Sequence, residues 1–253
     1  MCPGPLLGRV TKAMKMEQQQ AFLTAEWNHL LMFNYAVDPA LLESHVPKGT
    51  ELDSFDGRTY VSLIGFEFND TRISGVRIPF HGSFEEVNLR FYVRRSQKRG
   101  VVFIRELVPK WGVAAVARVA YGERYSCTPM THRIHYRLDR DVIEVEYSWG
   151  KGASTCAMRA ETESAPYLPV GGSLGQFITE HYWGYASRGR GLTIEYEVQH
   201  QRWQVRGVRS AEVSGDATQY YGGELGRIVM QPPDSAFLAE GSTVTVFKGI
   251  RLD

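Results

Sequence analysis

Apolar and polar residues alternate in the manner of β-strands along most of the chain. Over residues 86–94 the apolar positions share one face, and they are Val87, Leu89, Phe91 and Val93. The polar positions share the other face, and they are Glu86, Asn88, Arg90, Tyr92 and Arg94. Residues 60–68 are largely apolar on both faces, which is typical of a strand buried on both sides. Further strands are predicted at 101–107, 132–138, 142–149, 192–199, 204–213 and 243–248, with a hairpin loop at 96–100.

Helices are predicted at three places that carry start signals. Asp38 followed by Pro39 begins a short helix that runs to about residue 45. Pro109 begins a second helix, whose apolar face falls on residues 113–121. Ser173 and Gln176 form a capping box for a third, with His181 at helical spacing from Leu174. Many antiparallel strands with few helices predict an α+β, predominantly antiparallel β fold built around a curved sheet or a barrel.

The composition indicates a folded protein that needs neither a metal nor disulfides to fold. The chain has 253 residues, 43% hydrophobic and 23% charged, with 29 basic against 28 acidic residues. We expect a disordered leader at 1–20 and a single domain at 21–253. The near-neutral charge argues against a nucleic-acid binder. The three cysteines are widely spaced, so we expect no metal site, and no nucleotide-binding motif indicates a cofactor.

The expected location is the cytoplasm. Residues 1–20 contain no apolar core of a signal peptide, and the longest apolar stretch, at 113–121, is too short to cross a membrane. An aromatic content of 12% leaves enough surface for a homo-oligomer, although no motif marks an interface.

The polar face of residues 86–94 has two interpretations. Glu86, Asn88, Arg90 and Tyr92 either face water or line a polar cavity inside a barrel. The sequence alone does not decide between them.

The segment from Arg105 to Trp111 contains a candidate reactive amine. Lys110 would lie in the first turn of the helix that Pro109 begins, where the helix dipole disfavours a cation. Trp111 next to it would exclude water, and Arg105 would add like-charge repulsion if it points the same way. An imine-forming lysine must lose its charge near pH 7, which requires burial. The alternative is an exposed lysine at a helix start, offset by Glu106.

Several motifs identify the chain as similar to a known family. They are Glu26-Trp27, Asn34-Tyr35-x-Val37-Asp38-Pro39, Val46-Pro47-x-Gly49-Thr50-Glu51-Leu52-Asp53, Tyr60-Val61-Ser62-Leu63, residues 84–93, residues 179–185 and Ala239-Glu240-Gly241-Ser242. Together they resemble the YqjF-like family of uncharacterised bacterial proteins over about residues 20–253.

That family in turn is similar to the acetoacetate decarboxylase-like superfamily, which implies a β-barrel with a polar interior cavity. The resemblance implies that Lys110 matches the lysine that forms a Schiff base in those decarboxylases. Trp111 stands where they carry a second lysine, and their two acid–base glutamates fall near Ser62 and Ile73. These departures count against decarboxylation of a β-keto acid and leave other carbonyl chemistry for Lys110.

Two functional hypotheses follow, with a structural or oligomeric partner protein as a weaker third. In the first, the protein is an enzyme of decarboxylase, aldolase or dehydratase type acting on a small keto acid or aldehyde. Its catalytic residues are Lys110, Glu106 and Arg105. Its substrate-binding residues are Glu86, Arg90, Tyr92, Trp111 and His181. In the second, a non-catalytic barrel binds a small anionic or aromatic metabolite.

Overall fold

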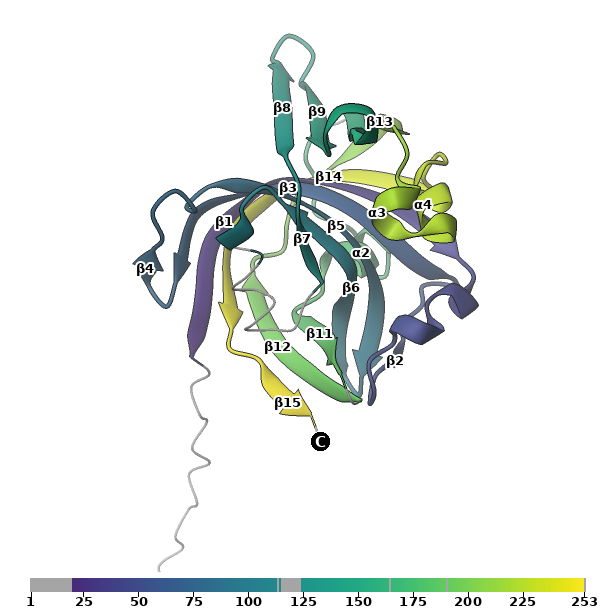
Figure 1. Ribbon diagram of the computed structural model, residues 1–253. Coiled ribbons are helices and arrows are strands. Elements are labelled where there is room, and N and C mark those ends of the chain that lie inside the picture. The colour runs from purple at the N-terminus through teal and green to yellow at the C-terminus, as the bar shows by residue number, and fades with distance from the viewer. Residues whose placement is uncertain (1–19, 113, 115–123, 164, 190, 253) are drawn as a thin grey trace, which may run out of the picture.

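The protein has a mostly β architecture with a few short helices (Figure 1). The computed structural model describes residues 20–112, 114, 124–163, 165–189 and 191–252. Seven strands form its central framework: β1 (Ala21–Val37), β3 (Thr59–Ile73), β5 (Phe84–Arg95), β6 (Lys98–Val108), β11 (Trp183–Arg188), β12 (Leu192–His200) and β14 (Ser235–Phe247). Neighbours in this framework pair antiparallel except β6 and β11, which pair parallel.

The pairing of the seven strands returns to its starting point. Their order is β12-β11-β6-β5-β3-β1-β14, and β12 pairs again with β14, where Val198 lies opposite Val246. Because side chains alternate across a strand, every strand of this circuit presents one set of side chains to the interior and one to the outside. We call these seven strands the strand circuit.

A second layer covers part of the outside of the strand circuit. Its strands are β8 (Met130–Arg137), β9 (Val142–Trp149), β10 (Cys156–Thr162) and β13 (Val205–Ser214), and β13 also pairs with β14. Gly65 of β3 lets this layer come close. A Cβ atom at Gly65 would lie 2.7 Å from a ring carbon of Tyr147 and 2.9 Å from the sulfur of Met158.

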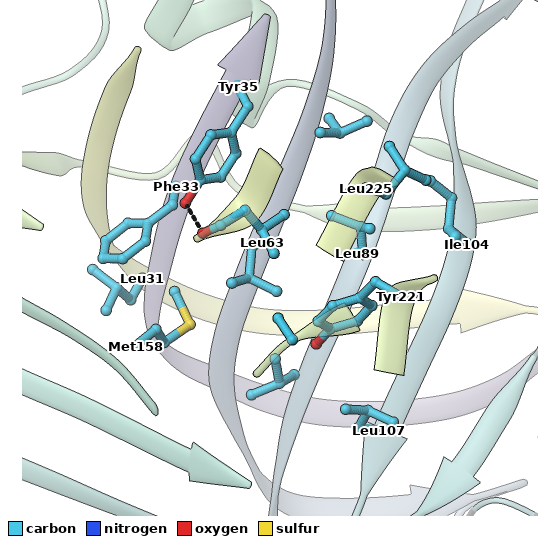
Figure 2. Packing of buried hydrophobic residues seen from close by; sticks show 14 of the residues in the cluster. Leu31, Phe33, Tyr35, Leu63, Leu89, Ile104, Leu107, Met158, Tyr221 and Leu225 are labelled. Carbon is cyan, nitrogen blue, oxygen red and sulfur yellow. Dashed lines mark hydrogen bonds between the residues drawn. The ribbon is translucent and has the colours of Figure 1, made fainter. Parts of the chain in front are cut away.

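The main hydrophobic core lies between the outer face of the strand circuit, the second layer and two short helices. Those helices are α3 (Thr218–Tyr221) and α4 (Gly223–Val229). Figure 2 shows Leu63 and Leu89 from the circuit packed near Tyr221 and Leu225 from the helices. The hydroxyl of Tyr35 donates a hydrogen bond of 2.8 Å to the carbonyl oxygen of Val229, which ties β1 to the end of α4.

The remaining elements are short. They are the strands β2 (Glu51–Leu52), β4 (Val76–Arg77), β7 (Tyr125–Cys127) and β15 (Ile250–Leu252), the helix α2 (Leu174–Thr179), and the 3-10 turns η1 (Pro39–Leu41), η2 (Glu43–His45) and η3 (Gly152–Ser154). Over the ranges that the structure describes, no helix has the length and apolar character needed to cross a membrane.

The predominantly antiparallel β fold predicted from the alternation is confirmed, and all eight predicted strands are present. Three of the longer strands were missed, namely β1, β10 and β11, as were the short strands β2, β4, β7 and β15. The chain reverses at Ser96 and Gln97, so the predicted hairpin loop at 96–100 is too long. β5 and β6 extend beyond the residues that alternate between apolar and polar, because their backbone pairing continues past those residues.

The helix predictions are partly right. Asp38 caps as expected by accepting from the amide of Ala40, but the helix after it is two separate 3-10 turns. Ser173 caps α2, and α2 ends at Thr179, so His181 lies beyond the helix rather than on it. The helix expected from Pro109 begins at Trp111. Most of its predicted apolar face, at 113 and 115–121, lies outside the described residues, as do residues 1–19 of the leader predicted at 1–20.

Candidate functional site

A cavity of about 550 Å³ lies within the strand circuit, and each of the seven strands contributes to its lining. Most of the lining is apolar, with the aromatic residues Phe22, Trp27, Phe66, Phe68, Phe84, Phe103, Trp183 and Trp203 prominent in it. Polar side chains enter the lining mainly from β5, β6, β7 and the segment after α2. They include Glu86, Asn88, Arg90, Glu106, Tyr125 and His181. A volume of this size is typical of sites for small organic molecules.

The alternation along β5 places its polar face inside the molecule. Glu86, Asn88 and Arg90 line the cavity and are buried. Their neighbours Val87 and Leu89 face the opposite way and belong to the main core. Of the two interpretations of this strand, the structure selects the polar cavity.

Two buried carboxyl groups enter the cavity from neighbouring strands. Glu86 is 2% exposed and Glu106 is 1% exposed, and Glu106 of β6 pairs with Asn88 of β5. Oε1 of Glu86 accepts a 2.8 Å hydrogen bond from Asn88, and Oε2 accepts one of 3.1 Å from the hydroxyl of Tyr125. Tyr125 lies on β7, directly beside Glu106 in the parallel pair of β6 and β7.

Burial changes the acidity of these groups. Loss of hydration raises the pKa of Glu86 to about 7, although hydrogen bonds from Asn88 and Tyr125 and the charge of Arg90 work in the opposite direction. Burial also raises the pKa of Tyr125 well above 10, and both carboxylates and its hydrogen bond to Glu106 add to that rise. Near neutral pH, Glu86 therefore exchanges a proton readily while Tyr125 keeps its own.

A bulge in β6 determines which side chains of that strand face the cavity. Leu89 pairs with Arg105, but Arg90 pairs with Phe103, so one residue of β6 is extra at this point. Val101 and Phe103 line the cavity before the bulge, and Glu106 lines it after the bulge. Bulges of this kind re-aim side chains and are common next to functional sites.

Arg105 consequently points away from Glu106, on the outer side of the strand circuit. Its Nη1 donates a 3.0 Å hydrogen bond to Ser126, and its charge acts on Tyr221 of the outer core. The expected grouping of Arg105 with Glu106 and Lys110 around one substrate therefore does not occur. The physical reason is the bulge, which separates Arg105 from the inward-facing positions.

Arg90 is buried at 8% exposure. Its Nη2 donates a 3.2 Å hydrogen bond to the carbonyl oxygen of Ile178, while its Nε has no hydrogen-bond partner. In the described parts of the chain, no carboxylate oxygen lies within 4 Å of this guanidinium. A buried cation without an ion pair is energetically unfavourable.

His181 lies close to Arg90 in the cavity wall. Its ring stacks on Tyr92 at 4.6 Å between centroids, and neither ring nitrogen has a hydrogen-bond partner. Burial lowers the pKa of His181 well below 6.5, and the charges of Arg99 and Arg90 lower it further. These effects outweigh an opposing interaction with the backbone of Ile178, so the imidazole is neutral. Tyr92, which was predicted to bind substrate, does not line the cavity. Its ring supports the stack, and its hydroxyl lies 2.5 Å from the hydroxyl of Ser62.

Lys110 is half-buried and does not line the cavity, although Trp111 and Gly112 directly after it do. Trp111 lines the cavity and is itself 75% exposed, which places it at the cavity mouth. Of the residues predicted from the sequence, the structure therefore brings together Glu86, Arg90, Glu106, His181 and, at the mouth, Trp111.

Two of the polar cavity residues that were not among the predicted site residues contact Glu86. Asn88 shares the alternating face of Glu86 and Arg90, so the pattern already contained its signal. Tyr125 had none, because it lies on a three-residue strand and reaches the carboxyls only through the pairing of β7 with β6. Across the described ranges, no cluster of three or more His, Cys, Asp or Glu side chains is arranged to hold a metal ion.

Solved structures with the same fold are acetoacetate decarboxylase-like. Acetoacetate decarboxylase from Legionella pneumophila superposes with a TM-score of 0.66 at 11% identity, covering 100% of this chain and 98% of its own. An acetoacetate decarboxylase-like enzyme from Sphingomonas wittichii gives 0.65 at 13% identity, covering 92% and 94%. The enduracididine biosynthesis enzyme MppR, solved in complex with pyruvate, gives 0.66 at 11% identity, covering 96% and 95%. At these identities the likeness shows the fold.

Sequence relatives identify the family. The uncharacterized protein YqjF of Bacillus subtilis is 27% identical over 192 residues, which cover 74% of this chain and 76% of YqjF. The family model DUF2071, described as an uncharacterized conserved protein, matches residues 24–243. The chain therefore belongs to this YqjF-like family of uncharacterized conserved proteins, and it carries the fold of acetoacetate decarboxylase.

Proposed function

We propose that the protein is an enzyme that moves protons at the carbon next to the carbonyl group of a small organic molecule. In this proposal the strand circuit acts as a barrel that encloses the substrate. The observation that carries the proposal is the position of Glu86, a carboxyl group buried in the cavity wall 3.1 Å from the Tyr125 hydroxyl. Burial there raises the pKa of Glu86 to about 7. A general base or acid is most effective when its pKa lies near the working pH.

The groups around Glu86 suit both steps of such a reaction, removal of the proton and its return. The carboxylate of Glu86 takes the proton from the carbon, and the electron pair of the broken C–H bond becomes the C=C bond of an enolate. Charge then develops on the former carbonyl oxygen, where a hydrogen-bond donor is needed. The Tyr125 hydroxyl, 3.1 Å from Glu86, is a donor that keeps its proton. Return of the proton from Glu86 restores the carbonyl compound.

Deuterium exchange tests this proposal. The protein is incubated in D2O with a panel of 2-oxo acids, ketones and aldehydes, and loss of the α-proton signal is followed by NMR. We expect exchange with at least one compound, and Glu86→Gln should slow it about 10²- to 10⁴-fold. Glu85→Gln is the matched control, because Glu85 is the adjacent residue of the same strand and pairs with His132 outside the cavity. Equal exchange by wild type and Glu86→Gln would contradict the proposal.

Imine formation at Lys110 is a second candidate. Two observations favour it: Lys110 directly precedes Trp111 and Gly112 in the cavity lining, and MppR, with the same fold, binds pyruvate. In this case a turn of the Lys110 side chain into the cavity brings the amine to the carbonyl carbon. The amine displaces water to form the imine, which then draws electrons from the neighbouring bond.

Borohydride reduction tests the imine directly. Reduction in the presence of pyruvate should add mass to the peptide that contains Lys110, and Lys110→Arg should abolish the adduct. Lys151→Arg, at an exposed position, is the control and should leave it unchanged. Absence of an adduct at Lys110 across a panel of keto acids and aldehydes would exclude this mechanism. If neither exchange nor an adduct is seen but ligands bind, the protein is a non-catalytic binder.

A further inference from the structure

Two buried side chains in the cavity wall carry nitrogen atoms that make no hydrogen bond of normal geometry within the protein. They are Arg90 and His181, which are 8% and 7% exposed. Nε of Arg90 and both ring nitrogens of His181 lack hydrogen bonds. Buried polar groups are almost always hydrogen-bonded, so such a cluster requires an explanation.

Another arginine nearby shows what a structural role would look like. Arg99 also acts electrostatically on His181, but its Nε donates a 2.6 Å hydrogen bond to Asp53, with which it forms an ion pair. Arg90 has the carbonyl oxygen of Ile178, the ring of Tyr92 with its centroid 5.7 Å from Cζ, and the more distant charge of Glu86, but no ion pair. The uncompensated charge of Arg90 therefore suits an anionic group that arrives with a ligand.

The rest of the cavity is too large and too apolar for a ligand that consists of an anionic group alone. If each heavy atom displaces about one water of about 30 Å³, a six-atom keto acid such as pyruvate fills about 180 Å³. The cavity holds about 550 Å³. The remaining space is bordered by Trp27, Phe66, Phe68 and Phe84, and it opens at Ile78 and Trp111, which are both exposed.

We propose that the cavity binds a carboxylic acid with an apolar tail, the carboxylate on Arg90 and His181 and the tail among the aromatic residues toward the mouth. The guanidinium donates to one carboxylate oxygen and the N–H of the neutral imidazole donates to the other. Burial of the tail supplies most of the affinity, and the carboxylate supplies selectivity for acids. This inference deepens the proposed function by naming its substrate class. It rests on that function because the acid would bind in the same cavity as Glu86.

Equilibrium binding of three probes by calorimetry tests this assignment. The probes are 3-phenylpropanoate, 3-phenylpropan-1-ol and acetate, measured at pH 6, where Glu86 holds its proton and the probe acids are ionised. We expect the acid to bind about 10- to 100-fold more tightly than the alcohol because charged groups strengthen hydrogen bonds. Acetate, which lacks the tail, should bind at least about 100-fold more weakly than 3-phenylpropanoate.

Arg90→Gln should remove the preference for the acid and leave binding of the alcohol unchanged. Arg94→Gln is the matched control, since Arg94 lies on the same strand but is exposed and pairs with Glu51. Equal affinity of wild type for acid and alcohol would overturn the proposal even if Arg90→Gln fails to fold. An acid preference that persists in Arg90→Gln would overturn it as well.

The two proposals fail in different ways. Preferential binding of 3-phenylpropanoate without any deuterium exchange would contradict the proposed enzyme but support the acid site. Deuterium exchange on neutral ketones without preferential binding of acids would support the proposed enzyme and contradict the acid site.

Discussion

The two faces of β5 show how one strand serves two purposes. Val87, Leu89 and Phe91 are fully buried in the outer core among other apolar side chains. Glu86, Asn88 and Arg90, one residue away in each case, are also buried but line a cavity. The first face stabilises the fold through apolar burial. The second face costs stability, because it takes ionisable groups out of water without full compensation. Natural proteins keep such costs mainly where function requires them.

The largest effect on stability is expected from the apolar face. Phe91→Ala leaves a hole in the outer core and should lower the free energy of unfolding by about 3–5 kcal/mol. Denaturant unfolding measures the change, with Phe80→Ala, at an exposed loop position, as the control. A loss below about 1 kcal/mol would mean that this face is not tightly packed.

A substitution on the polar face should raise the free energy of unfolding instead of lowering it. Between pH 4.5 and 7 the folded protein keeps the proton of Glu86 while the unfolded chain has lost it, so this group makes stability fall as pH rises. Glu86→Gln removes that dependence. Its free energy of unfolding should exceed that of wild type by about 3 kcal/mol at pH 8 and by little at pH 4, since each pKa unit corresponds to about 1.4 kcal/mol.

Unfolding curves of both proteins at pH 4, 6 and 8 provide the measurement. Glu85→Gln serves again as the control and should not show the same pH-dependent gain. If Glu86→Gln is less stable than wild type at pH 8, Glu86 is an ordinary ionised carboxylate stabilised by its neighbours.

Contact between the strand circuit and the second layer should tolerate little extra volume. Gly65→Ala places a methyl group against Tyr147 and Met158 and should cost about 1–3 kcal/mol through forced repacking. Gly82→Ala is a suitable control, because a Cβ atom there meets no atom within 4 Å. Thermal unfolding distinguishes the two, and equal midpoints would show that the layers adjust freely.

The smallest effect is expected at Arg90. Arg90→Met replaces a buried guanidinium that has one hydrogen bond and no ion pair with an apolar side chain of similar length, and it should change stability by no more than about 1 kcal/mol, or increase it slightly. Denaturant unfolding at pH 7 is the measurement. A loss of several kcal/mol would show that Arg90 holds the fold together, and the contrast between the two faces would then disappear.

Local patterns predicted much of this fold. The boundaries of β9 follow its alternation, and the polar and apolar faces of β5 are visible in the sequence. In contrast, β1 was missed although it is 17 residues long. His29 has a positive φ of 51° and the register with β3 shifts between Asn28 and Leu31, so the alternation breaks in mid-strand.

The site was less predictable, because its geometry depends on pairing between distant segments. Simple alternation along 101–107 puts Arg105 on the face of Val101 and Phe103, and only the bulge moves Glu106 there instead. A bulge is specified by the pairing of two strands and leaves no local signature in one of them. Tyr125 likewise reaches Glu86 only because β7 pairs with β6.

The protonation of Glu86 is the most direct test of the account. A 13C NMR titration of the glutamate carboxyl carbons, compared with Glu86→Gln to assign the signal, measures the pKa of this group in the folded protein. The account predicts a midpoint at about 7. A midpoint near the ordinary value of about 4.3 would contradict it, because the carboxyl would then be hydrated and unsuited to proton transfer at neutral pH.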